Sequence, residues 1–269
     1  MTLIDLNKQL ADTISTIVRP LGDYIAVEIS GSDGFSFSYH ENIPMLSASL
    51  IKLPVLLYAY KSAELDSSIL EQTIHLDEQR IVSGSGVLQI LSLRDWTIRD
   101  LLALMINVSD NTATNLLMDF FGIENLQAWV EKQGLVETRI ERKMMDEEAQ
   151  REGRTNWISA HDANWMIQQI FSENDPLPDD AKAWLLHQQF RDKLPGLFDE
   201  KSQPVTVYNK TGEMEEIDHD AAYFFYNGHS VAATVLTSGI ENRQDALFPI
   251  QNIGQLIEEY LVEVAHSVG

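Results

Sequence analysis

Residues 43–60 read IPMLSASLIKLPVLLYAY, and inside this apolar stretch Ser49-Leu50-Ile51-Lys52 places a serine three residues before a lysine. The spacing of the apolar residues predicts a helix over 49–63. Two side chains at positions i and i+3 lie one turn apart on the same helix face, so the Lys52 ammonium can approach the Ser49 hydroxyl. A serine at a helix start also lies in the positive field of the helix dipole. The pair is therefore a candidate nucleophile with its activating amine.

A purely structural interpretation of this pair is also open, in which Ser49 caps the helix and Lys52 is solvated. The surrounding sequence opposes it, because Lys52 lies in an otherwise apolar helix. Burial of a lone ammonium is costly, so we expect Lys52 to have a buried partner or a chemical role.

Outward from this stretch, strand patterns occur at both ends of the chain and helical patterns in the middle. Alternating apolar residues predict strands at 25–29, 35–39, 205–210, 219–226 and 229–238. Asn227-Gly228, between the last two, is a strong hairpin signal. Apolar residues at helical spacing predict an N-terminal helix that ends at Arg19-Pro20, a C-terminal helix over 250–264, and helices without intervening strands from about 64 to 200.

This order predicts a mixed α/β (α+β) fold. Sequential hairpins favour one antiparallel sheet of about five strands, covered by the N- and C-terminal helices. We expect a sheet domain formed by residues 1–63 and 200–269, with an all-helical domain, residues 64–199, inserted into it. A ligand site is expected in the cleft between the two parts.

Composition excludes several functions. The 269 residues include 41 acidic and 19 basic side chains, for a formal net charge of −22, so the basic surface that nucleic acids or anionic membranes require is absent. The chain contains no cysteine, which excludes disulfides and thiol nucleophiles. No leader pattern or long apolar window occurs, and we expect a cytoplasmic protein.

Familiar cofactor motifs are also absent from the sequence. No HExxH pair, Walker loop, G-x-G-x-x-G fingerprint or G-x-S-x-G elbow occurs, and Gly84-Ser85-Gly86 is interpreted as a turn only. We therefore expect no metal and no cofactor, and a small molecule as the binding partner.

Two further motifs support the chemical interpretation of Ser49. Ser109-Asp110-Asn111 lies between two helical segments, and Lys210-Thr211-Gly212 closes the predicted strand at 205–210. S-x-x-K, S-D-N and K-T-G, in this order, are the motif set of class A β-lactamases and penicillin-binding proteins. The likeness extends through SGSGVLQIL and TIRDLLALMINVSDNTATNLLMDFFG. The sequence thus resembles a class A β-lactamase-related serine hydrolase, and this resemblance implies a β-lactamase-like fold.

The resemblance also implies a role for each motif residue. Ser49 would attack a carbonyl beside the amine of Lys52, and Ser109 would pass a proton to the leaving nitrogen. Asn111 would position Lys52 and a substrate amide. A substrate carboxylate would bind at Lys210-Thr211-Gly212, and the backbone N–H groups of Ser49 and Glu213 would form the oxyanion hole.

The chain departs from the family at the residue that activates water for hydrolysis of the acyl-enzyme. In β-lactamases an R-x-D-R stretch leads to a glutamate, with an asparagine four residues on. Here Arg139-Ile140-Glu141-Arg142 aligns that glutamate with Met144, and no asparagine follows at that interval. Three acids follow the aligned position, namely Asp146, Glu147 and Glu148.

Glu148 is our candidate for the displaced base. Met144 and Met145 would let the loop fold inward, and Glu148 is followed by Ala149 and not by a further charge. Activation by Lys52, or no activation at all, remains open.

The acidic residues that follow K-T-G affect which substrates the site can bind. Glu213, Glu215 and Glu216 add negative charge, and no arginine occurs over 219–226 to offset it. Repulsion of this kind costs on the order of 1 kcal/mol or more, so we expect it to disfavour a penicillin-like carboxylate.

The leading hypothesis is a serine hydrolase that acts through an acyl-enzyme on an amide or ester, with hydrolysis of β-lactams weak at most. One alternative is a penicillin-binding-like sensor that is acylated at Ser49 without efficient turnover. An inactive interaction protein is disfavoured, because all three motifs are intact.

Overall fold

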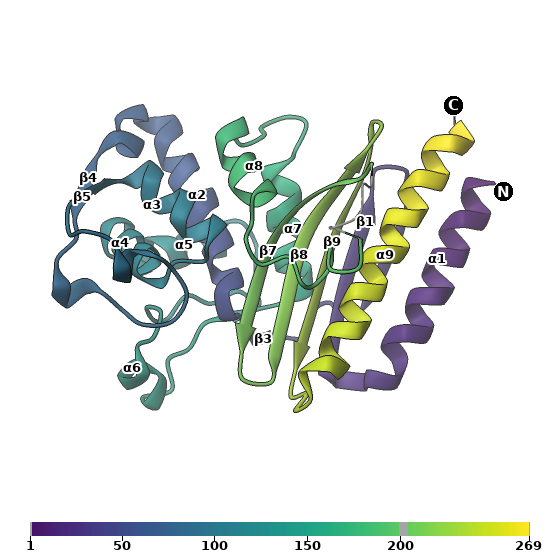
Figure 1. Ribbon diagram of the computed structural model, residues 1–269, viewed down its shortest axis with the longest axis horizontal. Coiled ribbons are helices and arrows are strands. Elements are labelled where there is room, and N and C mark those ends of the chain that lie inside the picture. Colours follow the sequence, from purple (N-terminus) through teal and green to yellow (C-terminus); the bar gives the residue numbers. More distant parts are fainter. Residues whose placement is uncertain (1, 199–203, 269) are drawn as a thin grey trace.

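Strands from both ends of the chain form one antiparallel sheet, in the order β2-β1-β9-β8-β7 (Figure 1). The computed structural model describes residues 2–198 and 204–268. The predicted five-stranded sheet is confirmed, while the expected domain boundary at residues 199–200 lies outside the described residues. The strands are β1 (Ile25–Gly31), β2 (Ser36–Tyr39), β7 (Thr206–Met214), β8 (Ile217–Tyr226) and β9 (His229–Ser238).

The hairpin between β8 and β9 turns at Asn227-Gly228, as predicted. Asn227 has φ 51° and Gly228 has φ 86°, the left-handed conformations that a two-residue turn of this hand requires. Tyr226 pairs with His229 directly across the turn. The local sequence therefore sets the register of these two strands.

The terminal helices α1 (Leu3–Val18) and α9 (Arg243–Val268) lie side by side over one face of the sheet (Figure 1). Ile14 of α1 and Ile257 of α9 are fully buried in a cluster with Val27 and Val235 of the sheet. Each helix thus buries the apolar stripe that its sequence predicted.

Helices from the middle of the chain lie on the other side of the sheet (Figure 1). Among them, α7 contacts β1, β8 and β9. None of the helices in the described part of the chain has the length and apolar character needed to cross a bilayer. The helices are α2 (Lys52–Leu65), α3 (Ile98–Asn107), α4 (Asn111–Phe121), α5 (Ile123–Lys132), α6 (Glu147–Arg151), α7 (Ala160–Ile170) and α8 (Asp179–Leu186).

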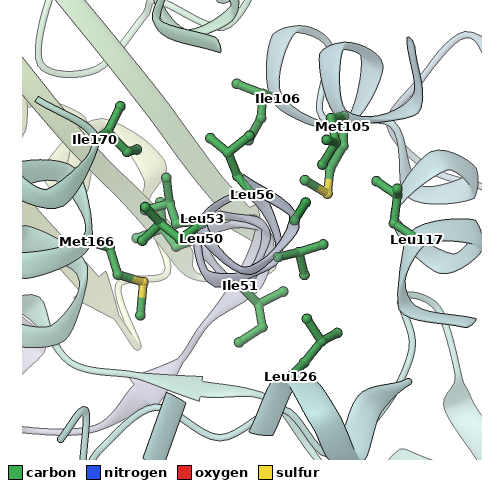
Figure 2. Close-up of a cluster of buried hydrophobic side chains, with 14 of the residues drawn as sticks. Leu50, Ile51, Leu53, Leu56, Met105, Ile106, Leu117, Leu126, Met166 and Ile170 are labelled. Atoms are coloured by element: carbon green, nitrogen blue, oxygen red, sulfur yellow. The ribbon is translucent and has the colours of Figure 1, made fainter. Parts of the chain in front are cut away.

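The first part of helix α2, up to Tyr60, is buried almost all round, which explains why its sequence is nearly continuous in apolar residues. Figure 2 shows Leu50, Ile51, Leu53 and Leu56 pointing outward around the axis of this segment, toward buried side chains of the neighbouring helices. Lys52 is fully buried in the same helix. The helix is therefore a fixed support for the residues at its N-terminal end.

The helical middle also contains short strands, and the expectation of helices alone was wrong. They are β4 (Thr73–His75), β5 (Asp95–Thr97) and β6 (Trp157–Ile158), and β6 pairs with β3 (Met45–Leu46). Segments of two or three residues are too short to show alternation in the sequence.

Two predicted boundaries also shift near the motifs. Residues Ala48–Ile51 form a 3-10 turn, so Ser49 precedes the α-helix and Lys52 is its first residue. Lys210-Thr211-Gly212 lies inside β7, which continues to Met214, and does not close the strand. Both differences place motif residues in rigid backbone, where their side chains keep one direction.

Candidate active site

The Lys52 ammonium is surrounded by oxygen atoms of the first two motifs. Its Nζ lies 3.0 Å from Ser49 Oγ, 2.9 Å from Ser109 Oγ and 2.9 Å from Asn111 Oδ1, and it donates to the Ser109 carbonyl oxygen at 2.7 Å. Burial, and then the neighbouring charge of Lys210, lower the pKa of Lys52 well below its ordinary value. Lys52 therefore has the buried polar partners that its sequence context required, and its burial favours the neutral amine.

The backbone at Ser109 makes this arrangement possible. Ser109 has φ 54°, a left-handed conformation that is uncommon for residues other than glycine. Both its carbonyl oxygen and its hydroxyl are within hydrogen-bonding distance of Lys52. Ala48, next to Ser49, also has a positive φ of 44°. Backbone strain of this kind costs on the order of 1 kcal/mol per residue and is concentrated at functional sites.

Lys210 of β7 approaches Ser109 as well. Its Nζ donates to Ser109 Oγ at 3.0 Å and to the Thr211 carbonyl oxygen at 2.7 Å, and the side chain is fully buried. Burial lowers the pKa of Lys210 to about 7, although the charge of Asp220 opposes this shift. The Ser109 hydroxyl thus connects two amines, and protons can pass among the three groups.

Strand β7 passes close to the turn that carries Ser49. A Cβ atom on Gly212 would lie 3.2 Å from Ala48 Cβ and 3.3 Å from the Ser47 carbonyl oxygen, closer than side chains normally approach. Only glycine allows this contact without displacement of the turn. The contact brings Glu213, the next residue of the strand, and Ser49 into the lining of one cavity.

Residues 83–85 also hold Asn111 in place. The side-chain Nδ2 of Asn111 donates to the Ser83 carbonyl oxygen, and its backbone N–H donates to the Ser85 carbonyl oxygen. A Cβ atom on Gly84 would lie 2.7 Å from Asn111 Nδ2, and one on Gly86 would lie 2.3 Å from the Asp110 carboxylate. Gly84 and Ser85 also line the cavity at Ser49. Gly84-Ser85-Gly86 is therefore more than the simple turn that its sequence suggested.

The cavity beside Ser49 has a volume of about 310 Å³ and extends to the segment 142–150. Glu147 lines it, whereas Glu148, the predicted base, is exposed and is not among the lining residues. Glu148 has no support from this geometry. Helix α6 begins at Glu147, so consecutive residues point in different directions.

Some residues that line the cavity were not predicted from the sequence. They are Leu46, Arg142, Gln150, Thr155, Asn156 and Met214.

Met144 occupies the position that the family resemblance assigns to glutamate, and its backbone is fixed. Asn115 accepts the Met144 N–H at 2.7 Å and donates to its carbonyl oxygen at 3.0 Å. The methionine lines the cavity. A thioether cannot take a proton from water, so this wall of the site is apolar where the family has a base.

Glu213, one of the three acids expected to repel an anionic substrate, has two cationic partners in the structure. Its carboxylate accepts from Lys193 Nζ at 3.2 Å and from Arg243 Nη2 at 2.6 Å. Lys193 precedes β7 and Arg243 begins α9, so neither lies on the strand at 219–226 where a compensating arginine was sought. The charge of Glu213 is therefore partly offset, because the same two cations also pair with Asp218 and Asp192.

Two buried polar residues lie on β8, the strand that pairs with the Lys210 strand β7. Asp220 of β8 is fully buried, accepts from Asn209 Nδ2 at 3.0 Å and from the Leu194 N–H at 3.0 Å, and burial raises its pKa to about 6. His219, on the same strand, is buried against the Leu46 carbonyl oxygen, and burial lowers its pKa to about 4. Among the described residues, no group of three or more His, Asp or Glu side chains could hold a metal ion.

The fold and this serine–lysine site define a class, that of mixed α/β proteins with the class A β-lactamase fold. A family model described as "Beta-lactamase enzyme family" matches residues 6–261. The chain therefore belongs to the β-lactamase enzyme family, whose members are serine hydrolases.

Solved structures with the same fold include a β-lactamase from Sphaerobacter thermophilus, with a TM-score of 0.82 and 22% identity over 94% of this chain and 96% of that one. PBP-A matches with a TM-score of 0.80 and 21% identity over 96% of each chain. A variant of PBP-A with glutamate in place of one leucine, solved as an acyl-enzyme complex with penicillin G, has a TM-score of 0.80 and 20% identity over 97% of each chain. The comparison with curated proteins found no match.

Proposed function

We propose that this protein is a serine hydrolase that forms an acyl-enzyme at Ser49 with an amide or ester substrate. The observation that carries this proposal is the 3.0 Å contact between Ser49 Oγ and a fully buried Lys52 amine whose pKa burial has lowered. Serine is a weak nucleophile at its free pKa and needs an adjacent base. The depressed pKa of Lys52 supplies that base in the absence of a histidine.

In the acylation step, Ser49 Oγ forms a bond to the substrate carbonyl carbon, and its proton passes to the neutral Lys52 amine. The C=O π electrons move to the oxygen, which becomes an oxyanion. The backbone N–H groups of Ser49 and Glu213 are the proposed donors to it, supported by the close packing of Gly212 on the turn that carries Ser49. A donor of this kind contributes roughly 3–4 kcal/mol to the transition state.

Collapse of the tetrahedral intermediate breaks the bond to the leaving group. Ser109 Oγ lies 2.9 Å from Lys52 Nζ and is the proposed route by which the proton taken from Ser49 reaches the leaving nitrogen or oxygen. Lys210, 3.0 Å from the same hydroxyl, stabilises its anionic character during transfer. Lys210 and Thr211 are the proposed binding groups for a substrate carboxylate, and Asn111 for a substrate amide.

A second candidate function is a penicillin-binding-like protein that keeps its acyl group. Met144 favours it, because the side chain at the family's base position cannot activate water. The acyl-enzyme complex of the PBP-A variant with penicillin G shows that this fold accommodates such an adduct in that protein. The two candidates share the acylation step and differ in the lifetime of the product.

The test is intact-protein mass spectrometry after incubation with penicillin G and, separately, with a thioester substrate. A mass gain equal to the acyl group is expected in the parent protein and not in Ser49→Ala, which should remain folded because a small residue suits the 3-10 turn. Rapid loss of the adduct with product release supports the hydrolase, and a persistent adduct supports the penicillin-binding candidate. Undiminished labelling of Ser49→Ala, or no adduct with either probe, would contradict both.

A further inference from the structure

Arg142 lines the cavity together with Ser49, and its guanidinium has no ionic partner among the residues that the structure describes. Its Nε atom is buried and has no hydrogen-bond partner among residues 2–198 and 204–268, while Nη1 donates to the Lys143 carbonyl oxygen at 3.1 Å. Within this part of the chain, no carboxylate lies within 4.0 Å of it.

Within the described part of the chain, Lys143 and Arg154 of the same segment are ion-paired and Arg151 is not, and Arg142 differs from Arg151 in that it lines the cavity beside Ser49. Lys143 contacts Asp119 at 3.0 Å, and Arg154 forms an ion pair with Glu152. Both of these pairs are exposed to solvent and lie outside the cavity wall. The neighbouring lysine therefore provides a natural control for Arg142.

The backbone of the segment is held mainly by Asn156. Its Oδ1 accepts the N–H groups of Glu141 and Arg142 at 2.9 and 3.1 Å, and its Nδ2 donates to the Arg142 carbonyl oxygen at 3.0 Å. The Arg142 side chain adds one bond, from Nη1 to the Lys143 carbonyl oxygen. That bond to a neutral carbonyl leaves the guanidinium without a compensating negative charge.

The position of Arg142 makes this charge costly. Burial lowers its pKa, and the more distant Asp146 only partly opposes the shift. Met144 and Met145, on the same wall, are apolar. A partly buried cation against apolar neighbours gains most from a ligand that brings a complementary charge, because arginine matches a carboxylate with two parallel hydrogen bonds.

We propose that Arg142 binds a carboxylate on the acyl part of the substrate, the part that stays attached to Ser49. This inference rests on the proposed acylation of Ser49. Ser109 and Lys210, which serve the leaving group, do not line the cavity that contains Arg142. Its volume of about 310 Å³ accommodates a branch of several carbon atoms that ends in a carboxylate.

Two acids on the cavity wall do not prevent this binding. Glu213 is paired with Lys193 and Arg243. Glu147 is exposed, so solvent screens its charge more strongly than that of the partly buried Arg142. Among the residues that line this cavity, Arg142 is therefore the group that an anionic part of the substrate would contact.

The test compares two matched pairs of acylating probes by their second-order rate constants, measured by intact-protein mass spectrometry. One pair is penicillin G and carbenicillin, which differ by a carboxylate on the acyl side chain. The other is a pair of thioesters whose acyl chain ends in a carboxylate or in a carboxamide. We expect the parent to prefer the carboxylate member about tenfold, Arg142→Gln to lose this preference with little change for the uncharged member, and Arg142→Lys to retain part of it.

Lys143→Gln removes one positive charge from the same segment and should keep the preference. An equal loss in Lys143→Gln and Arg142→Gln would assign the effect to the general field of the segment and overturn the proposal. So would the absence of any preference in the parent. Thermal unfolding of each variant checks that the fold is retained.

Binding to the Ser49→Ala protein separates this inference from the proposed function. Calorimetry with penicillin G and carbenicillin measures recognition without acylation, and carbenicillin should bind about tenfold more tightly unless Arg142 is also replaced by Gln. If no probe acylates the parent but this difference persists, the proposed function fails and the anion site stands. If acylation occurs and neither experiment shows a difference, only the anion site fails.

Discussion

Lys52 Nζ contacts both polar groups of Ser109, its hydroxyl at 2.9 Å and its carbonyl oxygen at 2.7 Å. The two residues are 57 positions apart in the chain. With Ser49 Oγ and Asn111 Oδ1 also in range, four oxygen atoms surround an amine that has at most three N–H groups. When the amine is neutral, its lone pair can accept a proton from Ser49 at this distance.

Replacement of Lys52 by Met should remove most of the acylation rate and leave the protein folded. Methionine has a similar length and suits the apolar surroundings of α2, so we expect the free energy of unfolding to change by no more than about 2 kcal/mol. The acylation rate should fall by about 10²–10⁴-fold, the usual contribution of a general base. Mass spectrometry and urea unfolding measure the two effects separately. Acylation at the parental rate would show that the amine is not the base.

The acylation rate of the parent should fall on the alkaline side. The neutral form of Lys52 favours acylation, and the rate falls as Lys210 loses its positive charge near its pKa of about 7. Arginine at position 210 keeps its charge across the accessible range, so Lys210→Arg should move the falling limb upward by two pH units or more. Rate constants between pH 5 and pH 9 test this. A falling limb at the same pH in parent and variant would mean that a different group is titrated.

Deacylation is where the structure and the sequence prediction favour different acids. Glu147 lines the cavity and Glu148 does not, so Glu147→Gln should slow decay of the adduct more than Glu148→Gln. A general base contributes about 10²–10⁴-fold, and acylation should change little in either variant. Adduct decay after single-turnover acylation provides the comparison. Equal decay in both variants and the parent would exclude both acids and favour deacylation through Lys52 or a persistent adduct.

Asp220 gives a stability prediction with a defined pH dependence. Burial raises its pKa from 3.8 to about 6, so between these values the folded state binds more protons than the unfolded state, and the Asp220 contribution to stability falls as pH rises. Asp220→Asn removes this titration and places an NH₂ group against the donors Asn209 and Leu194. We expect a loss of about 1–3 kcal/mol near neutral pH and a larger loss at pH 4.

Urea unfolding of the parent and Asp220→Asn at several pH values between 4 and 7 measures this difference. Asp12→Asn, on the exposed face of α1, is the matched control and should show almost no change at any pH. A deficit for Asp220→Asn that stays constant over this range would show that Asp220 has an ordinary pKa in the folded protein.

The sequence by itself determined the features that depend on near neighbours in the chain. The three-residue spacing of Ser49 and Lys52, the turn at Asn227-Gly228 and the apolar stripe of α1 are local patterns, and each is present in the structure. The order of strands and helices then left one antiparallel sheet as the simplest way to bury both terminal helices. The three motifs also identified residues that the structure brings together around Lys52.

Only the tertiary structure decided which charged residues surround the group of motif residues around Lys52, because the contacts of these charged residues join distant segments of the chain. Glu213 is paired with Lys193 and Arg243, 20 and 30 positions away, and no strand pattern could indicate them. The contact of Glu147 with the cavity depends on where α6 begins. Among the described residues, Asn156 holds the backbone at Arg142 and no carboxylate pairs with its guanidinium. Burial and pairing are properties of the packed molecule, since a charge in the sequence has no environment until the chain folds.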